Sequence, residues 1–364
     1  MFNPFKKLVP GASSFFEPED LDGKLDGFLD YIKGKKIYLA LSGGGLALVC
    51  HIAAIRLIEK LGISPERVYG TSAGAVVGGL YAAGLDSYQM ETAVLKLKNP
   101  DQLFGPGSRH FIFRAVKSEF EAQVWKNGFK KSGIYNSRRL ERYIQKSLRG
   151  FFNEAPRLKE LERPFSAVAF NIGSGKAHDP EANVKKVFST EDTPEVSLKD
   201  AVMASISIPG IFVPKKIGPY YYIDGGVVEN LPVVSAYEHW LRQRKFYQKN
   251  LVIMAVDLGY TGESLIEATN IRPHDMMLYA FSVEGKAINQ YSLLRTHNPR
   301  RGSHVILLKP RCYDMRLTDF HKIPGAIESS YTRMVDQLEG EGFLRETRED
   351  IQKARDFLGI ESRV

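Results

Sequence analysis

The sequence has little cysteine and no long hydrophobic run. Two cysteines among 364 residues exclude a disulfide-stabilised scaffold, and they do not have the spacing of a metal-binding motif. The eight histidines are scattered, without an H-E-x-x-H motif, so we expect no catalytic metal and no cofactor. The longest uncharged apolar stretch, residues 75–85, is far shorter than the roughly 20 residues that a membrane-spanning helix needs.

The composition and the charge do not select one partner. Apolar residues make up 43% of the chain and charged residues 25%, as in ordinary globular proteins. The net charge of +8 can attract nucleic acid, anionic lipid or an acidic protein. No apolar stretch near the N-terminus is long enough for a cleaved signal peptide, so we expect a cytoplasmic protein. Peripheral association with membranes and export by another route stay open, as does the oligomeric state.

Short apolar runs alternate with helical segments, which is typical of α/β folds. Residues 36–41 form a β-rich run that ends in glycines, and residues 46–61 form an apolar helix that stops at Gly62. Residues 67–69 and 73–83 repeat this order, which is the βαβ unit of a parallel sheet. Further strands are expected at 164–170, 185–188, 220–223 and 251–256, and further helices at 24–33 and 198–206.

The sequence therefore predicts an α/β fold, with a mostly parallel central sheet covered by helices on both faces. It contains no linker rich in Pro, Gly or Ser that would mark a second domain. We expect an N-terminal segment over 1–34 and one α/β domain over 35–325, which carries a helical insertion at about 86–160. A helical C-terminal tail is expected over 326–364.

A G-x-S-x-G pentapeptide stands between an expected strand and an expected helix, Gly70-Thr71-Ser72-Ala73-Gly74. A serine on such a tight turn is held in an exposed and strained pose, which bulky neighbours would prevent. The helix that follows directs its N-terminal N–H groups toward a reacting carbonyl. The pattern favours Ser72 as a nucleophile, with Gly70 and Gly74 as the small residues of its turn. An ordinary strand-to-helix turn is the alternative.

A run of three glycines, Gly43, Gly44 and Gly45, follows the strand expected at 36–41. Backbone N–H groups in such a loop can face an anion without interference from side chains. The loop is thus a candidate oxyanion hole or phosphate cradle, or a simple tight turn. No G-K-[S/T] follows, so it is not a Walker motif.

A carboxylate followed by two glycines, Asp224-Gly225-Gly226, comes after the strand expected at 220–223. A serine needs a base to lose its proton, and a partly desolvated carboxylate with a raised pKa can serve. The glycine loop, the serine and the carboxylate each follow an expected strand, and such sites gather at the carboxyl ends of parallel strands.

Four blocks of the sequence together resemble the patatin-like phospholipase family. They span about residues 38–234 and read, in order, LSGGGLALVCHIAAI, YGTSAGAVVGGLYAAG, AVMASISIPGIFVP and YYIDGGVVENLPV. In that family a Ser–Asp dyad cleaves acyl esters of lipids without histidine or metal. The resemblance implies that Ser72 is the nucleophile and Asp224 the base, and that the substrate is a phospholipid or lysophospholipid.

The resemblance also assigns supporting roles. Gly43, Gly44 and Gly45 would supply the oxyanion donors. Gly225 and Gly226 would support the loop of the base, and the block at 207–210 would lie near it.

The chain departs from the family pattern directly after the glycine loop. The family usually continues as x-R/K-G, whereas this chain has Leu46, Ala47 and Leu48. A cation near an oxyanion would stabilise it, so its loss predicts a lower rate, an altered substrate or a need for activation. A lipid-binding pseudoenzyme and a lipid acyltransferase are the alternatives to a hydrolase. The presence of both Ser72 and Asp224 favours catalysis.

A Ser-His-Asp triad is not forbidden by chain order, because five histidines follow Asp224. None of them lies in a Gly-rich context, and His51 is expected to be a packed core residue. The five are His239, His274, His297, His304 and His321.

Two basic segments, 126–131 and 138–149, carry aromatic residues. Such segments can bind an anionic membrane surface or nucleic acid, or can form a solvent-exposed helical face. For an enzyme with a lipid substrate we favour a membrane surface, and we do not expect nucleic acid to bind.

Overall fold

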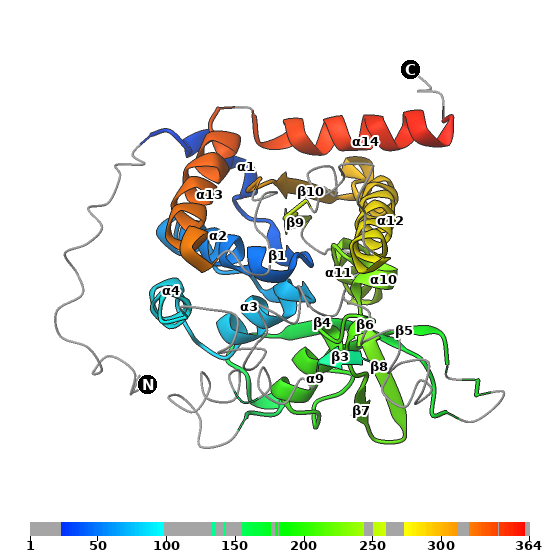
Figure 1. Ribbon diagram of the computed structural model, residues 1–364. Helices are drawn as coiled ribbons and strands as arrows, with labels where there is room; N and C mark the ends of the chain where they lie inside the picture. The colour runs from blue at the N-terminus through cyan, green and yellow to red at the C-terminus, as the bar shows by residue number, and fades with distance from the viewer. Residues whose placement is uncertain are drawn as a thin grey trace.

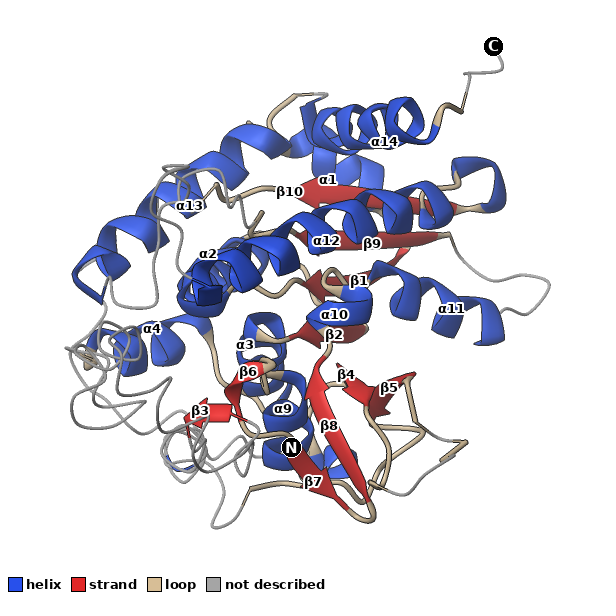
Figure 2. Ribbon diagram, turned by 45° about the vertical axis from the view of Figure 1, so that its right-hand side comes forward, coloured by secondary structure: helices blue, strands red, loops and turns tan. Residues whose placement is uncertain are grey.

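A mixed sheet forms the centre of the molecule in the computed structural model (Figures 1 and 2). The structure describes residues 23–97, 133–135, 142, 155–175, 179–180, 182–243, 250–259, 273–311, 320–340 and 342–360. Within these residues the sheet has eight strands in the order β10-β9-β1-β2-β4-β8-β7, with β5 also paired to β4. The first five strands of this order are parallel, and β5, β7 and β8 are antiparallel to their neighbours. The strands are β1 (Lys36–Leu41), β2 (Arg67–Thr71), β4 (Phe165–Asn171), β5 (Val184–Ser189), β7 (Lys215–Ile217), β8 (Tyr220–Asp224), β9 (Leu251–Val256) and β10 (Ser303–Leu308).

The central strands are apolar because both faces of the sheet are covered. Every residue of β9 is buried. In β1, Leu39 and Leu41 belong to one hydrophobic core, and Tyr38 and Ala40 belong to the other. This alternation has the period of two that a strand imposes, so each strand contributes to two cores.

Helices cover the two faces unequally. Figure 1 shows α2, α3 and α13 on one side of the sheet and α11 and α12 on the other. The first core includes residues of α1 (Asp26–Ile32), α2 (Leu48–Lys60), α3 (Ala73–Ala82), α4 (Ser87–Leu95), α9 (Leu198–Ser205) and α13 (Ile323–Leu338). The second includes residues of α11 (Val233–Gln243) and α12 (Pro273–Thr296).

The edge of the sheet at β10 is covered by α14 (Arg345–Leu358). The N–H group of Leu307 in β10 donates to Thr347 Oγ1 at 2.8 Å, which satisfies one of the donors that an edge strand leaves unpaired. Among the described helices, none combines the length and the hydrophobicity that crossing a bilayer would demand.

The predicted strands and helices are confirmed with small shifts in their bounds, and so is the mostly parallel sheet. Three of the larger described elements were not predicted, the helices α11 and α12 and the edge strand β10. The C-terminal tail is helical as expected, but α13 packs into the core beside α2. The division of the chain into segments stays a prediction.

Most of the insertion expected at about 86–160 lies outside the described residues, as do the basic segments 126–131 and 138–149 apart from Arg142. Inside that range the structure describes the helix α4 and a short strand, β3 (Gly133–Tyr135), which pairs with β6 (Gly210–Phe212).

Candidate active site

Two strands meet end to end beside β4. Thr71, the last residue of β2, pairs with Val168, and Asp224, the last residue of β8, pairs with Ala169. Because β2 is parallel to β4 and β8 is antiparallel to it, the carboxyl ends of β2 and β8 face each other. Ser72 and Asp224 are thereby brought together. The expectation that the carboxylate would arrive on a parallel strand was wrong, since β8 runs in the opposite direction.

Ser72 lies on a strained turn between β2 and α3. Its φ is 50° and its ψ is −117°, a conformation that residues other than glycine rarely adopt. The turn is tight at both flanking glycines: a Cβ on Gly70 would collide with the carbonyl of Gly74, and a Cβ on Gly74 would collide with the carbonyl of Leu41. The sequence prediction that these glycines form the turn agrees with this packing.

A second serine, Ser205 at the end of α9, holds the backbone of this turn. The Ser72 N–H group donates to Ser205 Oγ at 2.9 Å, and Ser205 Oγ donates to the carbonyl of Val168 at 2.5 Å. On the other side, Gly74 N–H donates to the carbonyl of Ser42 at 3.0 Å. The turn is therefore fixed to both β4 and the end of β1.

Asp224 is a buried carboxylate with a raised pKa. Burial raises its pKa to about 6, and hydrogen bonding by the Ser72 hydroxyl and by the Gly226 N–H group opposes the rise. Gly226 N–H donates to Oδ1 at 2.7 Å. Oδ2 has no partner with full hydrogen-bond geometry among the described residues. The Ser72 hydroxyl thus lies close enough to the carboxylate to oppose the rise in its pKa.

The loop that carries Asp224 is held from two sides. Asp224 N–H donates to the carbonyl of Ser207 at 2.9 Å, which agrees with the expected support from the 207–210 block. A Cβ on Gly225 would collide with the carbonyl of Val168, and a Cβ on Gly226 would lie 3.1 Å from Asp224 Oδ1. Both glycines therefore permit close packing around the carboxylate.

The glycine loop approaches Ser72, but its three N–H groups are not equivalent. Gly43 N–H already donates to the carbonyl of Asn230 at 3.0 Å. The N–H groups of Gly44 and Gly45 have no acceptor among the described residues. A Cβ on Gly43 would collide with Asn230 Oδ1 and would lie 3.2 Å from the Cβ of Ser72, so the loop has no room for a side chain there. Of the three predicted oxyanion donors, Gly44 and Gly45 remain available and Gly43 is engaged.

The position where the family usually has arginine or lysine, Ala47 in this chain, is apolar. Gly45 has a φ of 57° and begins a single 3-10 turn, Gly45–Ala47, that leads into α2. Leu46 and Ala47 are both buried in the first hydrophobic core. No cation contributes to the pKa of Asp224 among the described residues. An oxyanion formed here would therefore depend on backbone N–H groups.

The short helix α10 (Gly226–Glu229) and the two residues after it join the parts of the site, and we call residues 226–231 the α10 clasp. The Thr71 hydroxyl donates to the carbonyl of Glu229 at 2.8 Å, and the carbonyl of Asn230 accepts the N–H group of Gly43. The clasp thus links the base, the nucleophile strand and the glycine loop. Sequence reasoning missed these contacts, although Asn230 stands in the D-G-G-x-x-x-N block.

Four of the described histidines contact other residues. His51 is fully buried, its Nε2 lies 2.8 Å from the carbonyl of Ser42, and burial lowers its pKa to about 4. It is the packed core residue that the sequence predicted. Three of the other histidines, His239, His297 and His304, contact Tyr69, Val305 and Tyr31 respectively. None of these four histidines is among the groups that set the pKa of Asp224.

Several curated proteins are similar to part of this chain. An uncharacterised NTE family protein of Mycobacterium tuberculosis is 25% identical over 202 residues, which are 55% of this chain and 28% of that protein. A probable lipid hydrolase of Invertebrate iridescent virus 6 is 24% identical over 226 residues, 57% of this chain and 65% of that protein. Lysophospholipase NTE1 of Cryptococcus neoformans is 25% identical and is matched over 11% of its length. The chain thus spans only part of each relative.

Solved structures with a similar outline include VipD from Legionella pneumophila, at a TM-score of 0.40 and 15% identity over 84% of this chain and 66% of that one. Human GIVD cytosolic phospholipase A2 gives a TM-score of 0.40 and 10% identity over 90% of this chain and 63% of that one. The family model for patatin-like phospholipases matches residues 39–237, a range that includes Ser72, Asp224 and the glycine loop. Since this match covers more than half of the chain, the protein belongs to the patatin-like phospholipase family.

Proposed function

We propose that this chain hydrolyses acyl ester bonds in phospholipids or lysophospholipids, with Ser72 as the nucleophile and Asp224 as the base. Membership of the patatin-like phospholipases supports a lipid substrate, and the names of two relatives, a lipid hydrolase and a lysophospholipase, support hydrolysis. One observation carries the proposal. A buried carboxylate with a pKa of about 6 lies beside the hydroxyl of a serine on a strained turn.

The first half of the reaction forms an acyl-enzyme. Asp224 takes the proton of the Ser72 hydroxyl as Oγ attacks the ester carbonyl carbon, and the carbonyl electrons move to its oxygen. When the tetrahedral intermediate collapses, the ester C–O bond breaks and the leaving alkoxide takes the proton from Asp224. A carboxylate pKa near 6 suits both steps, because the group accepts and returns a proton close to neutral pH.

The second half releases the fatty acid. Asp224 takes a proton from water as the water oxygen attacks the acyl carbon. Collapse of this second intermediate breaks the bond to Ser72 Oγ, which recovers its proton from Asp224. This scheme needs no further acid or base, and among the described residues no histidine contributes to the pKa of Asp224.

Backbone N–H groups would hold the oxyanion in both halves. Gly44 and Gly45 are supported as donors because their N–H groups have no acceptor among the described residues. The N–H group of Ala73, at the start of α3, is a third candidate, and the dipole of that helix favours negative charge there. Removal of a single oxyanion donor typically lowers kcat by about 10²–10³-fold, so two or three such donors are a sufficient source of stabilisation.

Fatty-acid release from mixed-phospholipid and lysophospholipid liposomes tests the proposal. We expect release by the wild type and its loss in both Ser72→Ala and Asp224→Ala, while thermal melting shows that both variants remain folded. A Ser329→Ala variant is the matched control, because it removes the hydroxyl of an exposed serine on α13 and should leave release unchanged.

Other outcomes of these assays would support one of the two alternative functions. Acyl chains that appear on an added alcohol or lipid acceptor, and not as free acid, would make the protein an acyltransferase. Liposome binding with no product from any lipid would support a lipid-binding pseudoenzyme, for which the apolar Ala47 is the structural reason.

A further inference from the structure

One buried side chain of α12, that of Asn289, joins two loops that come from distant parts of the chain. Its Oδ1 accepts the N–H group of Leu231 at 3.0 Å, and its Nδ2 donates to both carboxylate oxygens of Asp257, each at 3.4 Å. Leu231 is the last residue of the α10 clasp, and Asp257 directly follows β9. The amide of Asn289 therefore connects the clasp to the carboxyl end of the central sheet.

Asp257 is a buried carboxylate that the proposed reaction does not use. Burial raises its pKa, and the Gly259 N–H group, the charge of Lys309 and the Asn289 amide oppose that rise. A buried carboxylate is costly unless it is hydrogen-bonded or paired, so Asp257 favours a donor beside it. Because the carboxylate accepts and the Leu231 N–H group donates, only one orientation of the amide satisfies both partners.

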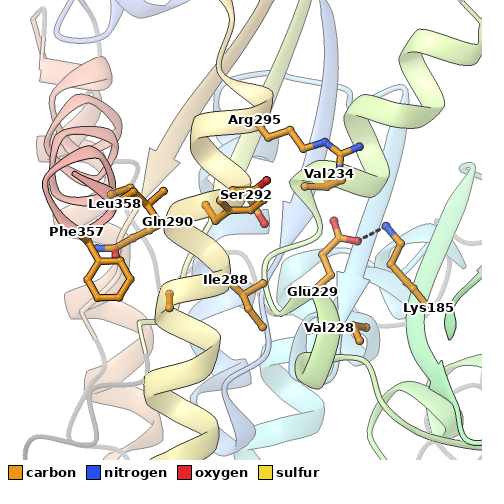
Figure 3. A pocket seen from close by; sticks show the side chains of 13 residues that line it. Lys185, Val228, Glu229, Val234, Ile288, Gln290, Ser292, Arg295, Phe357 and Leu358 are labelled. Atoms are coloured by element: carbon orange, nitrogen blue, oxygen red, sulfur yellow. Dashed lines mark hydrogen bonds and ion pairs between the residues drawn. The ribbon is translucent and has the colours of Figure 1, made fainter. Parts of the chain in front are cut away.

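Helix α12 packs against the clasp on either side of this contact. A Cβ on Gly285, one helical turn before Asn289, would lie in ordinary van der Waals contact with the Cβ of Asn230, at 3.7 Å. Ile288 of α12 and Glu229 of the clasp line the same pocket, and Figure 3 shows them on facing elements. The amide therefore lies within a packed contact between α12 and the clasp.

The glycine loop lies between the two segments that this amide joins. On the side of the clasp, the carbonyl of Asn230 accepts the Gly43 N–H group at 3.0 Å. On the side of β9, Leu258 N–H donates to Ser42 Oγ at 2.9 Å, and a Cβ on Gly44 would lie 2.5 Å from Leu258 Cδ1. The glycine loop is thus held by the sequence neighbours of both partners of the amide.

We infer that Asn289 is a positioning residue for the glycine loop. It holds the α10 clasp against Asp257, so that the N–H groups of Gly44 and Gly45 keep their place near Ser72. The inference rests on the proposed function, because an oxyanion has to form at this loop. Asn289 and Asp257 lie outside the range 39–237 that the family model matches, so family membership assigns them no role. Asn289 acts through the backbone of the clasp and not by contact with substrate.

Asn289→Leu tests the role of the amide. Leucine has nearly the same shape, but it can neither accept from Leu231 nor donate to Asp257. Because a small shift of the oxyanion donors weakens the transition state more than lipid binding, kcat should fall about ten- to a hundredfold with little change in KM. The matched control is Thr347→Val, which removes another buried hydrogen bond, the one to Leu307 N–H, and should leave kcat unchanged.

Reversal of the amide and the carboxylate tests the contact itself. Asn289→Asp places two carboxylates side by side, so at pH 8 kcat should fall about tenfold or more. Addition of Asp257→Asn should recover most of that loss, because the new carboxylate can accept from both Leu231 N–H and the new amide. These variants keep polar side chains of the same size, so they decide the matter even if leucine prevents folding. A double variant no more active than Asn289→Asp would overturn the inference.

Hydrogen–deuterium exchange of the glycine-loop peptide reports on the loop without turnover. Gly43 N–H is protected by its bond to the clasp, so Asn289→Leu should cause a loss of protection in the peptide that contains Gly43. Thr347→Val should leave that peptide unchanged, because its lost hydrogen bond lies at the β10 edge of the sheet.

The two proposals fail separately. Loss of protection at the glycine loop in Asn289→Leu, in a protein whose wild type releases no fatty acid from liposomes, would overturn the proposed function and keep Asn289 as the residue that holds the loop. Fatty-acid release by wild type with unchanged kcat in Asn289→Leu, or with unchanged protection of the loop, would overturn the inference and keep the function.

Discussion

Thr71 and Asp224 occupy neighbouring positions along one edge of β4, where Thr71 pairs with Val168 and Asp224 with Ala169. The residue after Thr71 is Ser72, so this register brings the proposed nucleophile close to a buried carboxylate. The contact depends on strand pairing and not on proximity in the sequence. Substitutions that shift the ends of β2, β4 or β8 should therefore lower activity more than they lower stability.

The pKa of Asp224 predicts the pH dependence of the reaction. Asp224 must be ionised to accept the proton of Ser72, and burial raises its pKa to about 6. The value of kcat/KM should therefore rise with pH and level off above about 6, and it should fall below that pH. The measurement uses a zwitterionic lipid, whose charge does not change in this range. An acid limb centred near pH 4 would show that the carboxylate is not desolvated.

The same raised pKa predicts that Asp224→Asn stabilises the protein at neutral pH. The folded pKa, about 6, lies above the unfolded value near 4, so wild type loses stability as pH rises from about 4 to 6, and the loss persists above 6. Asparagine carries no charge and avoids this cost, which is about 2–3 kcal/mol for a shift of this size.

Urea unfolding at pH 4 and pH 7.5 measures this difference. The free energy of unfolding of Asp224→Asn should exceed that of wild type by more at pH 7.5 than at pH 4. For Asp30→Asn, on the exposed face of α1, the difference from wild type should not change with pH in this way. A stability difference between Asp224→Asn and wild type that is equal at the two pH values would contradict the raised pKa of Asp224.

Gly74→Ala should damage the turn that holds Ser72. The new methyl group would collide with the carbonyl of Leu41, so we expect a loss of about 1–3 kcal/mol in the free energy of unfolding and a loss of activity. Gly325→Ala in α13 is the control, because no atom lies within 4 Å of its added Cβ and alanine favours a helix. Equal stability of the two variants in chemical unfolding would contradict the close packing at Gly74.

Thr71→Val should test the α10 clasp. Valine keeps the shape of threonine but removes the hydroxyl that donates to Glu229, which leaves a buried carbonyl unpaired at a cost of about 1–3 kcal/mol. Because the clasp also holds the glycine loop, we expect kcat to fall about tenfold or more with little change in KM. Thr332→Val, on the exposed face of α13, should leave both parameters unchanged. A normal kcat in Thr71→Val would show that the clasp does not position the site.

The sequence was sufficient to predict the centre of the fold. Residues 36–41 and 251–256 are apolar because both faces of their strands are covered, and this makes them recognisable without a structure. Ser72 and Asp224 could be proposed as a pair because each stands beside glycines that a tight turn requires, and because the blocks around them resemble the patatin-like family.

Features that depend on distant partners could not be predicted. The direction of β8 follows from its pairing with β4, which no local pattern in residues 220–224 reveals. The engagement of Gly43 by Asn230 requires two loops to meet, so three oxyanion donors were expected where two remain available. The helix α12 mixes polar and apolar residues without a clear period, and for this reason it was missed.

Labelling with a fluorophosphonate probe, followed by mass spectrometry of the modified peptide, tests the Ser–Asp dyad most directly. The account predicts that wild type is modified at Ser72, that Ser72→Ala is not modified, and that folded Asp224→Asn is modified much more slowly. Equal labelling of wild type and Ser72→Ala would contradict the assignment of the nucleophile, and an undiminished rate in Asp224→Asn would contradict the assignment of the base.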